Sequence, residues 1–193
     1  MKKIACSLLG FVLCFMQPLS AALIEGQTIV VDGIELDLNR YNWSTKTYYA
    51  GFWSTSVGFF HIQRYDGSID IYGSNRNIRD LDVDNFYESL YPLEDNLLPY
   101  ATPFWKNEAD YELMSESNVV LDNRPAKKLV FEVTYPSNHS EIIITYLFTV
   151  EKPGYLYNSF LGHTISFSCQ KIKYPKVRYM IDAIANEMKI PQS

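Results

Sequence analysis

Two long runs of alternating apolar residues in the second half of the chain constrain its fold most tightly. Within Lys127 to Tyr135 every second residue from Leu129 onward is apolar, and the run from Glu141 to Val150 repeats the pattern. Side chains two positions apart on a strand share one face of a sheet, so each run predicts a strand with an apolar face. The polar loop Pro136 to His139 separates the two runs, which are therefore expected to be neighbouring antiparallel strands.

Turn signals separate further strands on both sides of this pair. Asp-Gly suits the two central positions of a type I′ turn, and it occurs at Asp32-Gly33 and Asp66-Gly67 between apolar stretches. Each of these pairs predicts a hairpin. Runs rich in β-branched and aromatic residues predict further strands at 47–54, 118–121 and 159–169, with turns at 122–125 and 152–154.

Helices are expected in the middle and at the end of the chain. Acidic residues precede a short helix from about Val83 to Tyr91, and Thr102-Pro103 opens a second short segment. From Tyr174 to Ile190 apolar residues recur at spacings of three and four, which predicts an amphipathic helix. The pattern predicts an α+β domain: an antiparallel sheet covered on one face by the C-terminal amphipathic helix and the short mid-chain helices.

The first 22 residues have the plan of a secretory signal peptide. Two lysines precede an apolar run from Ile4 to Phe15, and the small residues Ser20 to Ala22 follow it. The run is about 12 residues long, whereas a membrane-spanning helix needs about 20. We expect cleavage after Ala22, a single domain over 23–193 without a transmembrane segment, and export to the periplasm or the medium of a bacterium.

Cleavage would change the charge and the cysteine count. The net charge of −5 becomes −7, because Lys2 and Lys3 leave and no acidic residue does, and Cys169 remains as the single cysteine. Such a chain forms no intramolecular disulfide and depends on its core for stability. An acidic chain also lacks the cationic surface that nucleic acid requires, so no nucleic-acid partner is expected.

The order of elements in the second half resembles the PsbP/Mog1/DcrB-like domains. An Asn-Arg-Pro-Ala turn at Asn123 to Ala126 feeds the paired strands, and a Lys-Pro-Gly turn, another strand and a closing amphipathic helix follow. The resemblance covers Val119 to Ile190, about 40% of the chain. It implies an α+β fold and an exported accessory or protein-binding role. The family shares no catalytic motif that can be carried over to residues of this chain.

Motifs for catalysis are few. The sequence holds no G-x-S-x-G, Walker or G-x-G-x-x-G motif. Cys169 and His163 share the apolar face of one predicted strand about 20 Å apart, so Cys169 is interpreted as a buried core residue. Glu132 and Glu141 could act as paired acids, but 22 carboxylates supply many such pairs. No catalytic residue is assigned, and enzyme function is not favoured.

Metal and cofactor binding are not predicted either. His61, His139 and His163 show no H-x-H or H-E-x-x-H spacing, although a site assembled from distant segments stays open. A calcium loop beginning at Asp80 needs Gly at its sixth position and a carboxylate at its twelfth, and the chain has Asn and Tyr there. The acidic run is therefore interpreted as the start of a helix.

Aromatic residues are dense near the start of the predicted domain. They make up 15% of the chain, and eight lie between Tyr41 and Phe60. Because they alternate to both faces of the predicted strands, some must be exposed or covered by another layer. Tyr and Trp are enriched at binding surfaces, which makes candidate binding residues of Tyr41, Trp43, Tyr49 and Trp53. An aromatic core of a two-layer domain is the alternative.

Three functions are compatible with these features. The favoured one is an exported bacterial accessory protein that binds a protein or an envelope component without catalysis. The second is an exported hydrolase whose site is assembled from scattered carboxylates and His61. The third is a small outer-membrane β-barrel, which the helical middle and the amphipathic C-terminal helix argue against.

Overall fold

The structure is a computed structural model, and it describes residues 24–25, 28–31, 33–41, 43–54, 57–101, 109–152 and 159–191. The predicted signal peptide and the segment opened by Thr102-Pro103 lie outside the described residues. The elements are β1 (Ile24–Glu25), β2 (Thr28–Val31), β3 (Ile34–Asp37), the 3-10 helix η1 (Asn39–Tyr41), β4 (Ser44–Ser54), β5 (Val57–Arg64), β6 (Asp70–Ile78), α1 (Val83–Glu88), α2 (Leu93–Asn96), α3 (Leu98–Ala101), β7 (Asp110–Leu121), β8 (Arg124–Thr134), β9 (Ser140–Lys152), β10 (Ser159–Gln170) and α4 (Tyr174–Glu187).

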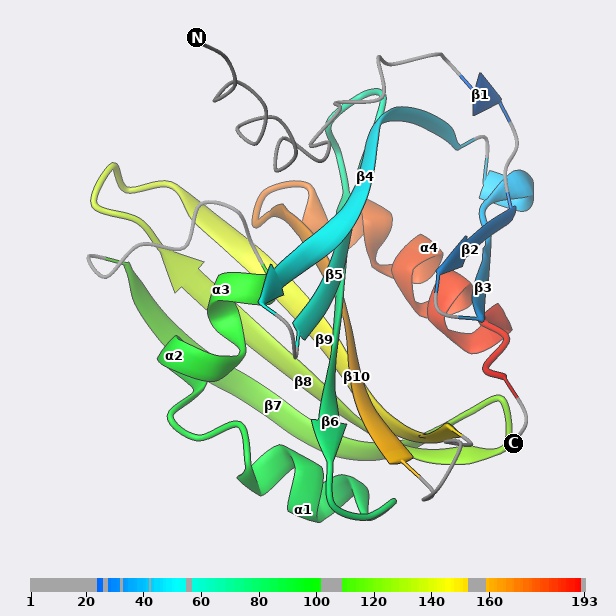
Figure 1. Ribbon diagram of the computed structural model, residues 1–193. Helices are drawn as coiled ribbons and strands as arrows, with labels where there is room; N and C mark the ends of the chain where they lie inside the picture. The colour runs from blue at the N-terminus through cyan, green and yellow to red at the C-terminus, as the bar shows by residue number, and fades with distance from the viewer. Residues whose placement is uncertain are drawn as a thin grey trace, which may run out of the picture.

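Eight strands form one antiparallel sheet in the order β1-β4-β5-β6-β10-β9-β8-β7, and β2 pairs with β3 in a separate hairpin. Strands β4 to β6 form one meander and strands β7 to β10 form another. The two meanders join where β6 pairs with β10 (Figure 1). The last strand of the chain thereby lies at the centre of the sheet, next to a strand from the first half.

Both predicted Asp-Gly hairpins are present. Gly33 (φ 80°) lies between β2 and β3, and Gly67 (φ 61°) lies between β5 and β6. Glycine adopts positive φ at little cost, which explains why these turns form at these positions.

The turn between β7 and β8 is tighter than predicted. Asp122 and Asn123 both have positive φ, 45° and 64°, and strand pairing resumes at Arg124.

The alternation in β8 and β9 gives the sheet two apolar faces. Ile142 and Ile144 of β9 belong to one core, whereas Ile143 belongs to the other, together with Leu129 and Phe131 of β8. Strands that are apolar on both faces need a covering layer on each. We call the side of Ile142 the α4 face and the opposite side the α1 face, after the helices that cover them.

Helix α4 and the β2–β3 hairpin pack in the core of the α4 face. Val177, Ile181 and Ile184 form the predicted apolar stripe of α4 and are buried there. Backbone hydrogen bonds between Glu35 and Lys189 tie the hairpin to the segment that follows the helix. The amphipathic character of the C-terminal helix is therefore confirmed, and its apolar side rests on the central strands.

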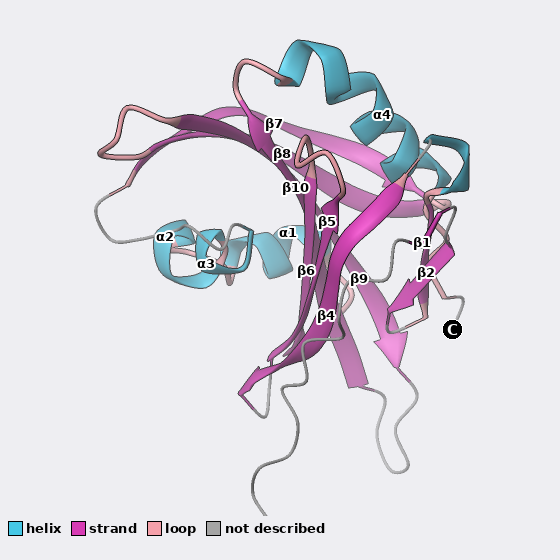
Figure 2. Cartoon of the chain, turned by 90° about the horizontal axis from the view of Figure 1, so that it is seen from above, coloured by secondary structure: helices cyan, strands magenta, loops and turns pink. Residues whose placement is uncertain are grey.

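The short helices α1, α2 and α3 cover the α1 face (Figure 2). The carboxylate of Asp82 accepts hydrogen bonds from the backbone N–H groups of Asp84 and Asn85, so the acidic run does start a helix, as predicted. The α+β class and the antiparallel sheet are confirmed. The short helices, expected on the same face as α4, lie on the opposite one, because β8 and β9 are apolar on both sides.

Strand β7 is longer than the strand predicted at 118–121 and forms one edge of the sheet. Most of its residues from Asp110 to Val120 are exposed and polar, so apolar alternation is weak there. Strand β7 pairs with β8 from Asp110 to Leu121, and this pairing accounts for the additional length.

In the part of the chain that the structure describes, no helix is long and apolar enough to cross a membrane.

Candidate functional site

The four predicted binding residues lie on η1, on β4 and on the connection between them. Trp43 is 1% exposed and belongs to the core of the α4 face. Tyr41 ends η1, is half-buried, and donates a 3.0 Å hydrogen bond from its hydroxyl to Glu187 of α4. Tyr49 and Trp53 lie in β4, and their side chains are outside the described part of the structure. The binding role of the four residues stays a prediction. Because Trp43 is buried, its side chain is not accessible to a partner in this structure.

His61, the predicted hydrolase residue, belongs to a polar group on the α1 face. Its Nε2 lies 2.9 Å from Oδ1 of Asp70, and the side-chain amide of Gln63 donates to the same oxygen at 3.0 Å. The ring of Tyr72 stacks on the imidazole, with 4.4 Å between ring centres and 6° between planes. A carboxylate that orients an imidazole in this way is one part of a general-base site.

A hydrolase also needs a nucleophile that reaches its base. On the α1 face the buried hydroxyl of Ser168 donates to Glu141 at 3.1 Å, and that of Thr149 donates to the carbonyl of Leu81 at 2.6 Å. Four other buried hydroxyls bond to one another across the strands: Ser74 with Thr164 at 2.6 Å, and Thr145 with Ser166 at 2.8 Å. All four residues are at most 5% exposed. Such pairs satisfy buried polar atoms, and they give these hydroxyls a role in packing the sheet against its helices.

The other two histidines and the cysteine lie in separate places. His163 is buried and stacks on Phe148 at 5.3 Å, whereas His139 lies in the β8–β9 turn with its Nε2 3.5 Å from Glu141. Cys169 is buried as predicted, and burial raises the pKa of its thiol to about 12, which leaves it inert. Over the described ranges, no three His, Cys, Asp or Glu side chains are grouped so as to hold a metal ion.

Lys127 is a buried cation on the α1 face, only 6% exposed. Its Nζ lies 2.7 Å from Oε1 of Glu116 and 2.9 Å from Oδ1 of Asp84, and it stands 4.8 Å from the ring centre of Tyr87. The hydrogen bond from Lys127 lowers the pKa of Glu116, and burial raises the pKa of Tyr87. Because its charge is matched by two carboxylates, this cluster connects α1 to β7 and β8 rather than forming an open site.

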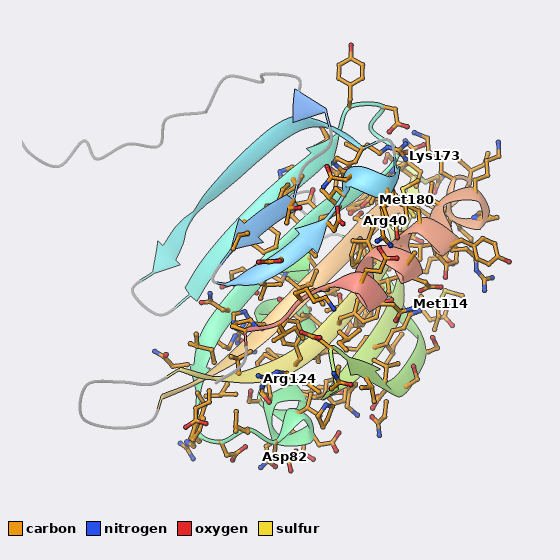
Figure 3. The ribbon with its side chains drawn as sticks, turned by 90° about the vertical axis from the view of Figure 1, so that its right-hand side faces the viewer. Arg40, Asp82, Met114, Arg124, Lys173 and Met180 are labelled. Atoms are coloured by element: carbon orange, nitrogen blue, oxygen red, sulfur yellow. The ribbon has the colours of Figure 1, made fainter. Side chains whose placement is uncertain are left out.

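Three turns meet at one end of the sheet, which we call the turn end. They are the β5–β6 turn at 65–69, the β8–β9 turn at 135–139 and the β10–α4 turn at 171–173. The backbone N–H of Lys171 donates to the carbonyl of Ser140 at 3.0 Å, and Nζ of Lys173 donates to the carbonyl of Gly67 at 3.3 Å. Figure 3 shows Lys173 at the start of α4, with Met180 further along the helix.

Exposed apolar side chains and cations gather at the turn end. The exposed fractions are 84% for Ile172, 75% for Tyr179 and 59% for Tyr65. From Gln170 to Met180 the chain has four basic residues and no acidic one, in a protein of net charge −5. We define the α4 patch as Lys171, Ile172, Lys173, Lys176, Arg178 and Tyr179.

The stability of α4 does not account for these cations. The first turn of a helix is the positive end of its dipole, where acidic residues stabilise and basic residues destabilise. In α4 the N-cap is Lys173, the first turn holds Lys176 and no acidic residue, and the last turn holds no basic residue. Lys173 and Lys176 are thus placed against the helix dipole. Two of the four cations have partners within the protein, since Nζ of Lys171 lies 2.6 Å from Oε1 of Glu132 and Nζ of Lys173 donates to Gly67. The stability of the helix leaves Lys176 and Arg178 unexplained.

A solvent-open hollow of about 370 Å³ adjoins the α4 patch at the turn end. Two residues of the patch, Lys171 and Ile172, form part of its wall, and the β8–β9 turn, the start of β9 and the end of β10 form the rest. Its lining residues are Asn138, His139, Ser140, Gln170, Lys171 and Ile172.

No family model and no curated protein matches the sequence. A solution structure of PsbP from the cyanobacterium Synechocystis sp. PCC 6803 matches with a TM-score of 0.55 at 11% identity, over 94% of this chain and 99% of that one. The chain has the PsbP fold. A crystal structure of a Pseudomonas aeruginosa protein of unknown function matches with a TM-score of 0.42 at 8% identity, over 88% of this chain and 99% of that one.

The PsbP fold confirms the resemblance and extends it. The sequence pattern covered Val119 to Ile190, whereas the structural match also takes in the first half of the chain. At this identity the match fixes the fold and transfers no functional residue.

None of the residues of the α4 patch was predicted to bind a partner. The sequence feature that could have identified them is the cluster of basic residues from Lys171 to Arg178, which coincides with the start of a predicted helix. Basic residues in the first turn oppose the helix dipole, so they add nothing to the stability of the helix.

Proposed function

We propose that this PsbP-fold chain is an exported accessory protein that binds an envelope component through the turn end and catalyses no reaction. The observation that carries the proposal is the α4 patch, in which Ile172 and Tyr179 are exposed beside cations placed against the helix dipole. Exposed large apolar side chains and an unfavourable charge pattern both cost stability or solubility, and a binding surface accounts for both.

The interior of the domain supports binding rather than chemistry. The Lys127 cluster is charge-matched, four buried hydroxyls of the α1 face bond in pairs, and the Cys169 thiol is buried. The hydrolase alternative would use the pair formed by His61 and Asp70. Loss of a hydrolytic activity on replacement His61→Ala, in a variant that folds normally, would favour that alternative.

Export is part of the proposal and has its own test. The signal-like plan of residues 1–22 and the single cysteine left after cleavage support it. Expression of the full chain in a bacterium, followed by fractionation and mass spectrometry, should give a periplasmic or secreted form that begins at Leu23. A full-length chain retained in the cytoplasm would contradict export.

The binding function is tested by photo-crosslinking in intact envelopes. The unaltered chain is compared with a Lys176→Glu/Arg178→Glu variant and with Arg79→Glu/Lys189→Glu, a control with the same change of charge at exposed residues outside the patch. We expect the unaltered chain and the control to be crosslinked to an envelope component, and the patch variant to lose the crosslink. Equal crosslinking by all three, or none by any, would contradict binding through the turn end.

A further inference from the structure

We propose that the α4 patch docks on an anionic lipid bilayer, an inference that rests on the proposed function and names its partner. Peripheral proteins bind such surfaces with cations that approach the headgroups and with Tyr or aliphatic side chains that enter the interface. The α4 patch supplies both kinds of side chain from one turn and the start of one helix.

The apolar tip of the patch is held rigidly. Ile172 lies in the tight turn between β10 and α4, where Lys171 N–H donates to Ser140 and Lys173 N–H donates to Gln170 at 2.8 Å. With 84% of its surface exposed, Ile172 projects from a fixed backbone. A contact residue that is already ordered costs little entropy on binding.

Aromatic and cationic side chains alternate on the outer side of α4. Lys176 and Tyr179 are three positions apart and therefore neighbours on the helix surface, and both are exposed. The guanidinium of Arg178 stands 5.3 Å from the ring centre of Tyr179. A tyrosine flanked by cations suits the headgroup region, where its ring is apolar and its hydroxyl stays hydrated.

Electrostatic attraction gives the patch its selectivity for anionic lipid. Each Lys or Arg near an anionic surface strengthens binding by about fivefold, and this attraction weakens beyond a Debye length of about 10 Å at 0.1 M salt. Lys176 and Arg178 stand in a stretch without acidic residues, although the chain as a whole is acidic. The patch should therefore discriminate anionic from zwitterionic bilayers.

The composition of the patch favours a bilayer over a protein partner. The centres of protein interfaces are depleted of Lys, whereas Lys is abundant on helices that lie in the membrane interface. Here Lys173 and Lys176 lie within four positions of Ile172, the most exposed large apolar residue in the described part of the chain, and Lys171, which precedes it, is paired with Glu132 at 2.6 Å. The long aliphatic stem of the exposed Lys176 can lie along the acyl boundary while its ammonium group stays at the headgroups.

The test is co-sedimentation of the purified chain with vesicles. One set contains phosphatidylethanolamine with about 30% phosphatidylglycerol, and the other contains phosphatidylcholine alone. The unaltered chain is compared with Lys176→Glu/Arg178→Glu, with Ile172→Ser/Tyr179→Ser and with the control Arg79→Glu/Lys189→Glu. All four share the same residues 1–22, so differences among them report the patch. Circular dichroism and urea midpoints establish that each variant folds.

We expect at least tenfold preference of the unaltered chain for the anionic vesicles, decreasing as salt rises from about 0.05 to about 0.5 M. Charge reversal in the patch should reduce that binding at least tenfold, the serine variant should reduce it several-fold, and the control should stay within about twofold. Equal binding to both vesicle types, or equal binding by the patch variant and the control, would overturn the inference.

The crosslinking experiment in envelopes separates this inference from the proposed function. A patch-dependent crosslink to an envelope protein, without binding to anionic vesicles, would contradict the lipid partner and leave the binding function supported. Failure of both experiments would contradict both proposals.

Discussion

The ring of Phe86 in α1 lies so close to Gly162 in β10 that a Cβ built on the glycine would come within 2.5 Å of the ring. The absent side chain lets the helix approach the sheet, so Gly162→Ala should destabilise the protein. Overpacking of this kind costs about 1–3 kcal/mol. Urea denaturation with an unchanged m-value would measure the loss.

The double variant Phe86→Leu/Gly162→Ala is the control for this contact. If the clash with the ring causes the loss, the smaller Leu should recover part of it, and the two substitutions should be non-additive. Stability of Gly162→Ala equal to that of the unaltered chain would show that α1 can move away from the sheet at no cost.

The contact of Glu116 with Lys127 predicts a pH-dependent contribution to stability. The hydrogen bond from Lys127 lowers the pKa of Glu116 below its usual value of 4.5, so the carboxylate stabilises the fold above that pH and loses the contribution as the pH falls through its lowered pKa. Glu116→Gln should cost about 0.5–1 kcal/mol near pH 7, since the carboxylate is partly exposed.

Urea denaturation of the two proteins near pH 7 and near pH 3 checks the sign. The difference between the unaltered chain and Glu116→Gln should be present at the higher pH and shrink at the lower one. A difference that grows on acidification would contradict the role assigned to the ionised carboxylate.

Substitutions of Trp43 test whether the aromatic residues near the start of the domain form a core or a binding surface. It is 1% exposed, the Arg64 guanidinium lies 5.6 Å from its ring centre, and among the described residues its Nε1–H finds no acceptor. Trp43→Ala should cost about 3–5 kcal/mol, whereas Trp43→Phe should cost less than about 1.5 kcal/mol because it removes an unsatisfied donor and keeps a ring. Thermal or urea denaturation measures both.

Binding supplies the second readout for Trp43. In the core interpretation Trp43→Phe leaves crosslinking and vesicle binding unchanged. If Trp43→Phe is as stable as the unaltered chain but no longer crosslinks or binds vesicles, the aromatic binding surface predicted from the sequence would be supported instead.

The fold was largely predictable because its strongest signals are local. The periodicities of β8, β9 and α4 and the glycines at 33 and 67 each specify their element without reference to the rest of the chain. Strand β7 was underestimated, since an exposed edge strand carries little apolar alternation and is defined by its partner. The face on which α1 packs depends on how β8 and β9 pair, which no single segment encodes.

The candidate site was predictable only in part. Density of aromatic residues does not distinguish a surface from a core, and Trp43 belongs to the core. His61 and Asp70 lie on the two strands of the Asp66-Gly67 hairpin, which the sequence predicts. The hydrogen bond between their side chains could not be predicted from the hairpin alone. The α4 patch needed the exposure of Ile172 and Tyr179 to be recognised as a surface.

Cys169 should be unreactive in the folded protein. It is 4% exposed, and burial raises the pKa of its thiol to about 12, so almost no thiolate exists near pH 8. Reaction with Ellman's reagent should be much slower in buffer than in denaturant, because unfolding exposes the thiol and restores its ordinary pKa. The exported chain should show one thiol after denaturation and the unprocessed chain three. Rapid labelling of the folded exported chain would place Cys169 at the surface and contradict its position in the core.

The reversed charges of α4 predict a conflict between stability and binding at Lys176. This residue lies in the first turn, where a carboxylate interacts favourably with the helix dipole and an ammonium does not. Lys176→Glu should therefore stabilise the protein by about 0.3–1 kcal/mol while it weakens binding to anionic vesicles by fivefold or more. Asn186→Glu, which puts the same charge in the exposed last turn, should destabilise by a similar amount and leave vesicle binding nearly unchanged. Urea midpoints and co-sedimentation of both variants measure the two effects. If Lys176→Glu lowered stability, the cation would serve the fold rather than a partner.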